Sequence, residues 1–306
     1  MPSSAFELTA GEASLSLVPG CGGLIHALVL PTAVGPRNVI AGVDPSEWQD
    51  NPGYRGSVLF PFPNRLRDGR YRFAGREYQF LVNEQATGTA LHGFLYRTPA
   101  EVLRGGGDDE AQTVTLVYAC DATEPGYPFS ARVSMTYTLC ASGGLSVEMS
   151  VENRDSRAIP VGMGWHPYYT LGVRLDACRL ELPPVERVLV DKRMLPTGER
   201  VSDTRFAGGG ALQEVVLDDC FDLGSEPGRA AAVFTSRTAG FGLELWQETG
   251  PGALNFMQLY TPPDRQSLAV EPMSCGIDAL NTGDGLRILE PGQSVSGTFG
   301  VRVIGC

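Results

Sequence analysis

Apolar and polar residues alternate with a period of two along most of the chain. Residues 145–151 alternate without a break, and residues 131–139 do the same just upstream. A period of two sends successive side chains to opposite faces of a strand. The intervening residues 141–144 include two glycines, which tolerate the positive φ angles of a tight turn. The two segments therefore predict an antiparallel hairpin with one buried and one wet face.

Similar stretches recur along the chain and predict further short strands. They lie at 113–120, 176–182, 230–234, 242–246, 266–270 and 296–303. The 38 glycines and 22 prolines suit many strands joined by turns. No window of about fifteen residues keeps a helical apolar stripe, and only residues 44–50 suggest a short helical turn. We therefore expect one all-β domain over residues 1–306, a large antiparallel β-sandwich.

Composition and charge narrow the classes of partner. The 306 residues carry 35 acidic against 24 basic side chains, a net charge of -11. Such a surface repels phosphate backbones and anionic lipid, which argues against nucleic acid and membrane as partners. No apolar run approaches the roughly eighteen residues of a membrane span. The seven cysteines are dispersed without a C-x-x-C pair, and the first residues do not resemble a signal peptide. We expect a cytoplasmic protein with reduced, mostly buried thiols; the sequence leaves its oligomeric state open.

The three histidines are the first candidates for chemistry. His26 lies within an apolar strand pattern, which favours a structural role. His92 precedes a glycine that permits a sharp turn, and His166 lies among aromatic residues with a proline after it. Aromatic faces beside polar groups suit the C–H patches and hydroxyls of a sugar ring. From the residues alone, His92 and His166 remain open between functional and structural roles.

Glu271 is the natural acidic partner for these histidines. It follows the apolar residues 267–270 and precedes a proline, so we expect it at the end of a strand. There it is either partly desolvated, with a raised pKa that suits a general base, or simply solvated. Two histidines and a glutamate are also zinc ligands, but the sequence holds no H-E-x-x-H or similar short spacing. We therefore expect no metal.

Seven motifs in matching order make the chain resemble the aldose 1-epimerase (galactose mutarotase) family. They lie at 64–73, 78–83, 91–93, 166–169, 218–221, 256–261 and 271–292. The resemblance implies a β-supersandwich fold, which agrees with the period of two. The chain departs from the family's better-known pattern at Phe94, where a second glycine is usual, and at Trp165 and Pro167 beside the second histidine.

The resemblance also implies catalytic roles. Glu271 would be the general base that takes the proton of the C1 hydroxyl. His166 would be the general acid that protonates the ring oxygen, and His92 would hydrogen-bond the ring region. The ring would open to the aldehyde and close again as the other anomer, without a cofactor.

The remaining site residues would bind the sugar. Arg65 and Asp218 would hold its hydroxyls, with Asn64 and Gln258 as further candidates; Asp219 competes with Asp218. The implied partner is a small-molecule sugar, a free aldose.

Several alternatives stay open. A hexose 6-phosphate would need an arginine pocket, which the arginines of residues 67–76 could supply. A non-catalytic sugar-binding protein would not need all of His92, His166 and Glu271. A lyase on a related sandwich would need a catalytic set that we do not find.

Overall fold

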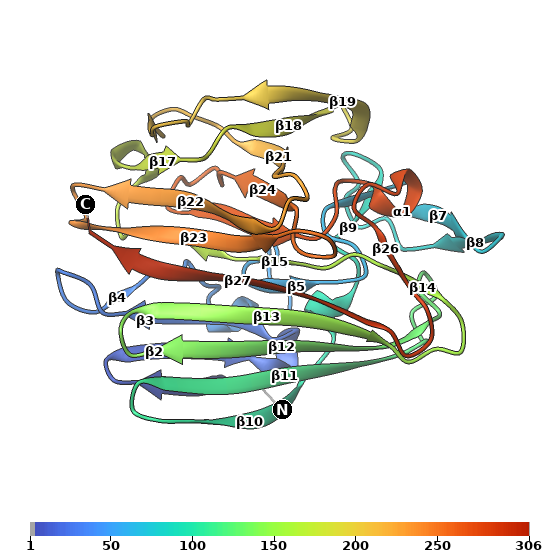
Figure 1. The fold of residues 1–306 in the computed structure, drawn as a ribbon, viewed down its shortest axis with the longest axis horizontal. Helices are drawn as coiled ribbons and strands as arrows, with labels where there is room; N and C mark the ends of the chain where they lie inside the picture. The colour runs from blue at the N-terminus through green and yellow to red at the C-terminus, as the bar shows by residue number, and fades with distance from the viewer. Residues whose placement is uncertain (1–3, 306) are drawn as a thin grey trace.

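The computed structural model describes residues 4–305, which form a layered assembly of antiparallel β-sheets (Figure 1). The largest sheet has nine strands. In spatial order they are β10 (Glu101–Gly107), β11 (Ala111–Asp121), β12 (Ser130–Cys140), β13 (Gly144–Asn153), β27 (Ser294–Ile304), β23 (Phe241–Thr249), β22 (Gly228–Ser236), β17 (Arg179–Glu181) and β20 (Gly210–Ala211). The predicted hairpin is confirmed as β12 and β13, whose buried residues alternate with more exposed ones. One face of this sheet therefore packs on the core while the other is wet.

A second sheet has eight strands. Its strands are β19 (Pro196–Asp203), β18 (Val185–Val190), β21 (Asp218–Asp222), β24 (Phe256–Tyr260), β25 (Leu268–Met273), β15 (Gly164–His166) and β5 (Ser57–Leu59), with β16 (Tyr168–Tyr169) paired to β25. All residues of β25 and β15 are buried. Both faces of this sheet are therefore covered at its centre.

The two faces of the eight-stranded sheet meet different surroundings. Leu268 and Val270 of β25 belong to the large hydrophobic core, whereas Met273 belongs to a smaller cluster. Trp165 of β15 packs against Phe299 of the nine-stranded sheet, with ring centroids 5.3 Å apart. Since neighbouring side chains on a strand point to opposite faces, Glu271 beside Val270 points away from that core.

Smaller elements complete the fold. A four-stranded sheet, whose first two strands pack on β11 and β12, consists of β1 (Phe6–Ala10), β2 (Ala13–Val18), β3 (Leu24–Leu30) and β4 (Arg37–Asn38). Three two-stranded pairs are β6 (Arg65–Arg67) with β9 (Thr89–Leu91), β7 (Arg70–Phe73) with β8 (Arg76–Gln79), and β14 (Ile159–Val161) with β26 (Arg287–Leu289). The helices are η1 (Pro19–Cys21), η2 (Pro45–Glu47), η3 (Leu95–Arg97), η4 (Leu175–Ala177) and α1 (Ala279–Thr282).

The predicted all-β sandwich is confirmed, with local differences. The helical turn expected at 44–50 is the 3-10 helix η2, where Asp44 accepts a hydrogen bond from the Ser46 amide. Residues 176–182 do not form one strand, because η4 occupies the first part and β17 follows. The short helix α1 was not expected. Cys120, Cys178, Cys220 and Cys275 are buried thiols, as predicted.

The strand that carries Glu271 is longer than expected. β25 runs on to Met273, so Glu271 lies inside the strand rather than at its end. The pairing of β25 with β15 and β16 skips residues 270–272. Pro272, which has no N–H to donate, is therefore accommodated within the strand. Among the described residues, no helix is long and apolar enough to span a membrane.

Candidate active site

A cavity of about 260 Å³ is lined by all seven residues that we expected in the site. It is lined by Gly53, Tyr54, Asn64, Arg65, Glu84, Leu91, His92, His166, Tyr168, Asp218, Gln258, Tyr260 and Glu271. Small-molecule sites usually enclose about 300–1,000 Å³, so this cavity is sized for a ligand of one ring.

Strand alternation places the polar residues of the eight-stranded sheet on one face. Asp218 of β21 pairs with Tyr260 of β24, and Gln258 of β24 pairs with Glu271 of β25. These side chains therefore form neighbouring rows on the cavity side. Asp219, the next residue of β21, points the other way and contacts Arg205 at 2.8 Å. The strand thus brings Asp218 and not Asp219 into the cavity.

The turn after β9 fixes the orientation of His92. Its backbone has a φ of 64°, and the amide donates a hydrogen bond to the carbonyl oxygen of Asn64 at 2.9 Å. The ring Nδ1 accepts a hydrogen bond from the amide of Asn64 at 3.1 Å. Burial, with His166 and Arg65 nearby, lowers the pKa of His92 well below its usual value. The ring is therefore neutral, with its proton on Nε2, and can donate a hydrogen bond from that atom.

Glycine is required directly after His92. Gly93 has a φ of 66°, and a Cβ there would lie 2.1 Å from the carbonyl oxygen of Phe60. Such an approach is not possible for any other residue without moving the backbone. The L-H-G turn is thus a steric requirement of the loop that presents the histidine.

His166 and Glu271 form a buried pair. His166 Nε2 lies 3.3 Å from Glu271 Oε1. Burial, reinforced by Asp218 and opposed by Arg65, raises the pKa of Glu271 well above its usual value. Burial lowers the pKa of His166 to about 3. Both shifts favour the neutral forms, so the pair holds one proton between its two members over a wide pH range.

Two atoms of this pair have unused hydrogen-bonding capacity. His166 Nδ1 and Glu271 Oε2 are buried and have no hydrogen-bond partner among the described residues. Buried polar atoms are nearly always paired in folded proteins, so unpaired ones beside a cavity point to a polar ligand. The ring of Tyr168 stacks on His166 at 5.0 Å between centroids and an interplanar angle of 10°, which holds the imidazole in place.

A chain of hydrogen bonds fixes the amide side chains. Asn64 Nδ2 donates to Gln258 Oε1 at 3.0 Å, and Gln258 Nε2 donates to Asp218 Oδ1 at 2.6 Å. Burial nevertheless raises the pKa of Asp218, against the effect of Arg65 and Gln258. The second oxygen of Asp218 lies 3.8 Å from Arg65 Nη2. Four of the predicted residues are thereby linked into one polar wall.

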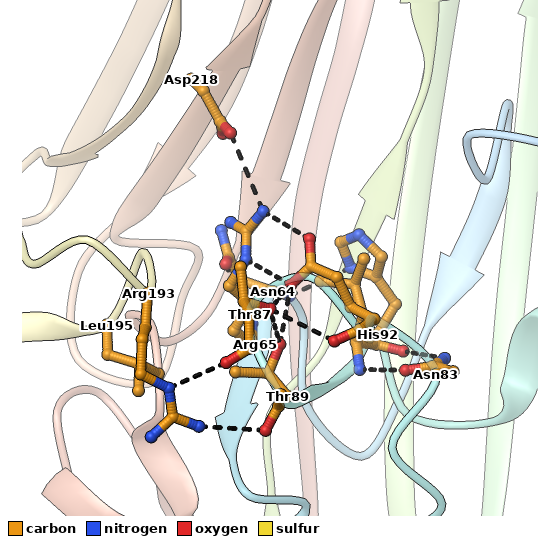
Figure 2. Close-up of polar contacts among 12 residues, drawn as sticks. Asn64, Arg65, Asn83, Thr87, Thr89, His92, Arg193, Leu195 and Asp218 are labelled. Carbon is orange, nitrogen blue, oxygen red and sulfur yellow. Dashed lines mark hydrogen bonds and ion pairs between the residues drawn. The ribbon is translucent and has the colours of Figure 1, made fainter.

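Sequence reasoning missed Glu84, the main partner of Arg65. Arg65 Nε and Nη2 donate to the two carboxylate oxygens of Glu84, each at 2.8 Å. Figure 2 labels Arg65 together with the nearby Thr87 and Thr89. The hydroxyls of Thr87 and Thr89 also donate to this carboxylate. Glu84 directly follows the asparagine that ends the second motif, but an acidic residue in a polar loop gives no signal that would distinguish it. Its importance follows only from the contact.

Tyr54 was also missed. It lies outside the motifs and has a φ of 55°. Its ring makes an edge contact with His92, with centroids 4.7 Å apart. Its hydroxyl accepts a hydrogen bond from Asn83 Nδ2 at 3.0 Å. Tyr54 therefore gives the cavity an aromatic wall beside His92. The predicted structural role of His26 agrees with its place in β3, where its Nδ1 lies 3.4 Å from Trp48 Nε1.

The site could also hold a metal ion. His92, His166 and Glu271 each offer one ligand atom, and these atoms lie within 4.8 Å of one another. Two imidazoles and a carboxylate are a donor set that zinc accepts. The expectation of a metal-free site stays a prediction, which metal analysis of the purified protein tests.

Comparisons with known proteins agree with this fold. The uncharacterized protein YihR of Escherichia coli is 32% identical over 247 residues, which cover 78% of this chain and 75% of YihR. Galactose mutarotase of Homo sapiens is 28% identical over 156 residues, which cover 48% of this chain and 42% of that enzyme. The solved structure of an aldose epimerase homologue from C. elegans superposes with a TM-score of 0.86 over 99% of both chains, at 21% identity. The aldose 1-epimerase family model matches residues 4–302, and the chain belongs to that family.

Proposed function

We propose that this protein is an aldose 1-epimerase that interconverts the α and β anomers of a free aldose. The observation that carries the proposal is the pair of proton-carrying groups, Glu271 and His166, buried at 3.3 Å beside a cavity the size of one sugar ring. Kinship with proteins named as galactose mutarotases supports the same reaction class.

The proposed reaction combines two proton transfers with the breaking and re-forming of one C–O bond. The ionised Glu271 takes the proton of the C1 hydroxyl, and protonated His166 gives its proton to the ring oxygen. The bond between C1 and the ring oxygen breaks, C1 becomes an aldehyde, and rotation about the C1–C2 bond exposes its other face. The reverse transfers close the ring as the other anomer. No electrons leave the sugar, so the proposed reaction needs no redox cofactor.

The number of protons on the pair suits this cycle, because transfer of the Glu271 proton to His166, 3.3 Å away, gives the reactive arrangement. Carboxylate with imidazolium holds the same number of protons as carboxylic acid with imidazole. Ring opening converts the first arrangement into the second, and ring closure restores it. His92, which donates from Nε2, would stabilise negative charge that develops on a sugar oxygen. In this proposal Arg65, Asp218, Asn64 and Gln258 bind the sugar hydroxyls.

The phosphorylated alternative finds less support. Arg70, Arg72 and Arg76 lie on β7 and β8, and none of them lines the cavity as far as the structure describes it. Arg67 contacts Asp278 at 3.3 Å. The cluster that could have formed a phosphate pocket therefore borders a different part of the surface.

Polarimetry tests the proposal directly. Freshly dissolved α-D-glucose and α-D-galactose are followed at neutral pH with and without the protein. We expect the rotation to decay faster than the spontaneous rate for at least one sugar, equally with and without EDTA. Sugar binding without acceleration would instead identify a non-catalytic binding protein, and loss of the acceleration in EDTA would identify a metal enzyme.

A further inference from the structure

Carboxyl groups outnumber arginines among the described residues that line the cavity. Among its lining residues, as the structure describes them, Arg65 is the one with a permanent positive charge. Glu84, Asp218 and Glu271 carry carboxyl groups, of which that of Glu271 shares a proton with His166. An arginine that recognises a phosphate or carboxylate group of a ligand uses its fork of N–H donors for that purpose. Here the fork is already engaged by the protein itself.

Glu84 is held as firmly as Arg65. It accepts hydrogen bonds from Arg65, Thr87 and Thr89, and these lower its pKa to about 2 although burial acts in the opposite direction. The backbone of this loop is tied to the turn between β18 and β19. There Arg193 donates to the carbonyl oxygens of Thr87 at 2.8 Å and Gly88 at 3.0 Å (Figure 2). The carboxylate thus stays ionised and in place across the physiological pH range.

The other arginines near the cavity are matched by acids as well. Arg55, which lies over the ring of Tyr168 at 4.3 Å, is 3.7 Å from Asp264. Arg193 contacts Asp68 at 2.6 Å. Arg55 and Arg193 therefore each face a carboxylate.

We propose that Glu84 determines the charge specificity of the site: it cancels the charge of Arg65 and thereby admits neutral aldoses while excluding aldoses that carry a phosphate or carboxylate group. This inference rests on the proposed sugar site. The fork uses Nε–H and one Nη2–H, which leaves the other guanidinium N–H groups for sugar hydroxyls. An anionic sugar would bring its charge toward Glu84 and Asp218, and the described lining residues offer no unpaired cation to meet it.

A charge series of probes tests this selectivity. Binding of D-glucose, D-glucuronate and D-glucose 6-phosphate to the full-length protein is measured by titration calorimetry, and mutarotation of each is followed in parallel. We expect affinity to fall with each added negative charge, by at least about a hundredfold from glucose to glucose 6-phosphate. Equal binding of the neutral and phosphorylated sugars by the unmodified protein would overturn the inference.

Two substitutions of Glu84 separate the effect of its negative charge from the effect of the position of its carboxylate. Glu84→Gln keeps an acceptor for Arg65 but removes the charge, so the preference for glucose over glucose 6-phosphate should narrow at least about tenfold. Glu84→Asp keeps the charge on a shorter side chain, so it should weaken glucose binding while retaining the preference. Glu124→Gln is the matched control, since Glu124 pairs with Arg97 at 2.8 Å outside the cavity lining. It should behave like the unmodified protein.

The outcomes distinguish this inference from the proposed function. If the protein binds glucose in preference to glucose 6-phosphate, Glu84→Gln weakens that preference and no mutarotation is seen, the inference stands and the enzyme proposal is wrong. If the protein catalyses mutarotation but Glu84→Gln leaves the preference for glucose over glucose 6-phosphate unchanged, the enzyme proposal stands and the inference about Glu84 is wrong. If no sugar binds at all, both are wrong. Thermal melts of each variant identify any loss of folding, and the measurements on the unmodified protein stand without the variants.

Discussion

The two large sheets of this protein use the same antiparallel pairing for different purposes. In the nine-stranded sheet, long strands alternate buried and exposed residues, and Glu244 of β23 meets Arg302 of β27 at its surface. In the eight-stranded sheet, the short strands β15 and β25 are fully buried, yet they carry His166 and Glu271. A charge on a wet face costs little, whereas a carboxyl inside a covered sheet is strongly perturbed. The comparison indicates that the candidate catalytic residues are the polar residues buried inside a sheet, where their burial lowers the stability of the fold.

The strongest test of the comparison removes one proton carrier from the eight-stranded sheet. Glu271→Gln and His166→Ala should each lower the turnover of the preferred sugar by about two to four orders of magnitude, because each lacks a proton carrier. Polarimetry at saturating sugar measures the loss. Turnover near that of the unmodified protein in either variant would contradict the assigned roles.

The same Glu271→Gln substitution should stabilise the protein at alkaline pH. The pKa of Glu271 is raised in the folded state, so its contribution to stability is present below pH 4.5 and is lost as pH rises through the raised value. Glutamine does not titrate, so the free energy of unfolding by urea at pH 8 should be higher in the variant than in the unmodified protein. If the variant and the unmodified protein differ in free energy of unfolding by the same amount at pH 5 and at pH 8, the raised pKa of Glu271 is contradicted.

A core substitution in the nine-stranded sheet should lower stability and leave turnover unchanged. Leu145 of β13 is 2% exposed and belongs to the large core. Leu145→Ala should lower the free energy of unfolding by about 2–5 kcal/mol through lost burial and a cavity. Turnover at a temperature where the variant is folded should stay unchanged. A large loss of turnover there would show that the two sheets are not separable in function.

The pH dependence of turnover probes the buried pair. Above the raised pKa of Glu271 the pair has lost its shared proton, so ring opening has no acid. Turnover should then fall about tenfold per pH unit. Below the pKa of His166, about 3, both groups hold protons and the base is missing. A rate that keeps rising into the alkaline range, after subtraction of the spontaneous reaction, would argue against a shared proton.

The smallest effect is expected from the matched control on the nine-stranded sheet. Glu244→Gln makes the same chemical change as Glu271→Gln, but at a partly exposed ion pair with a distance of 2.7 Å. It should change the free energy of unfolding by no more than about 1 kcal/mol and leave turnover unaffected. An effect on turnover comparable with that of Glu271→Gln would remove the distinction between the sheets.

The sequence by itself determined the class of fold and most of the site. Alternation with a period of two predicted the hairpin of β12 and β13, because it reflects a wet and a dry face on each strand. The same alternation separates Asp218 from Asp219 once the strand is known, and the motifs identified His92, His166 and Glu271.

The tertiary structure alone decided the rest. Glu84 and Arg65 lie nineteen residues apart in the sequence and meet only because β6 pairs with β9. The position of Glu271 inside β25, its burial and its 3.3 Å approach to His166 likewise depend on the strands that cover it. Local patterns report which face of a strand is wet, whereas pKa values and ion pairs depend on non-local neighbours that no local pattern encodes.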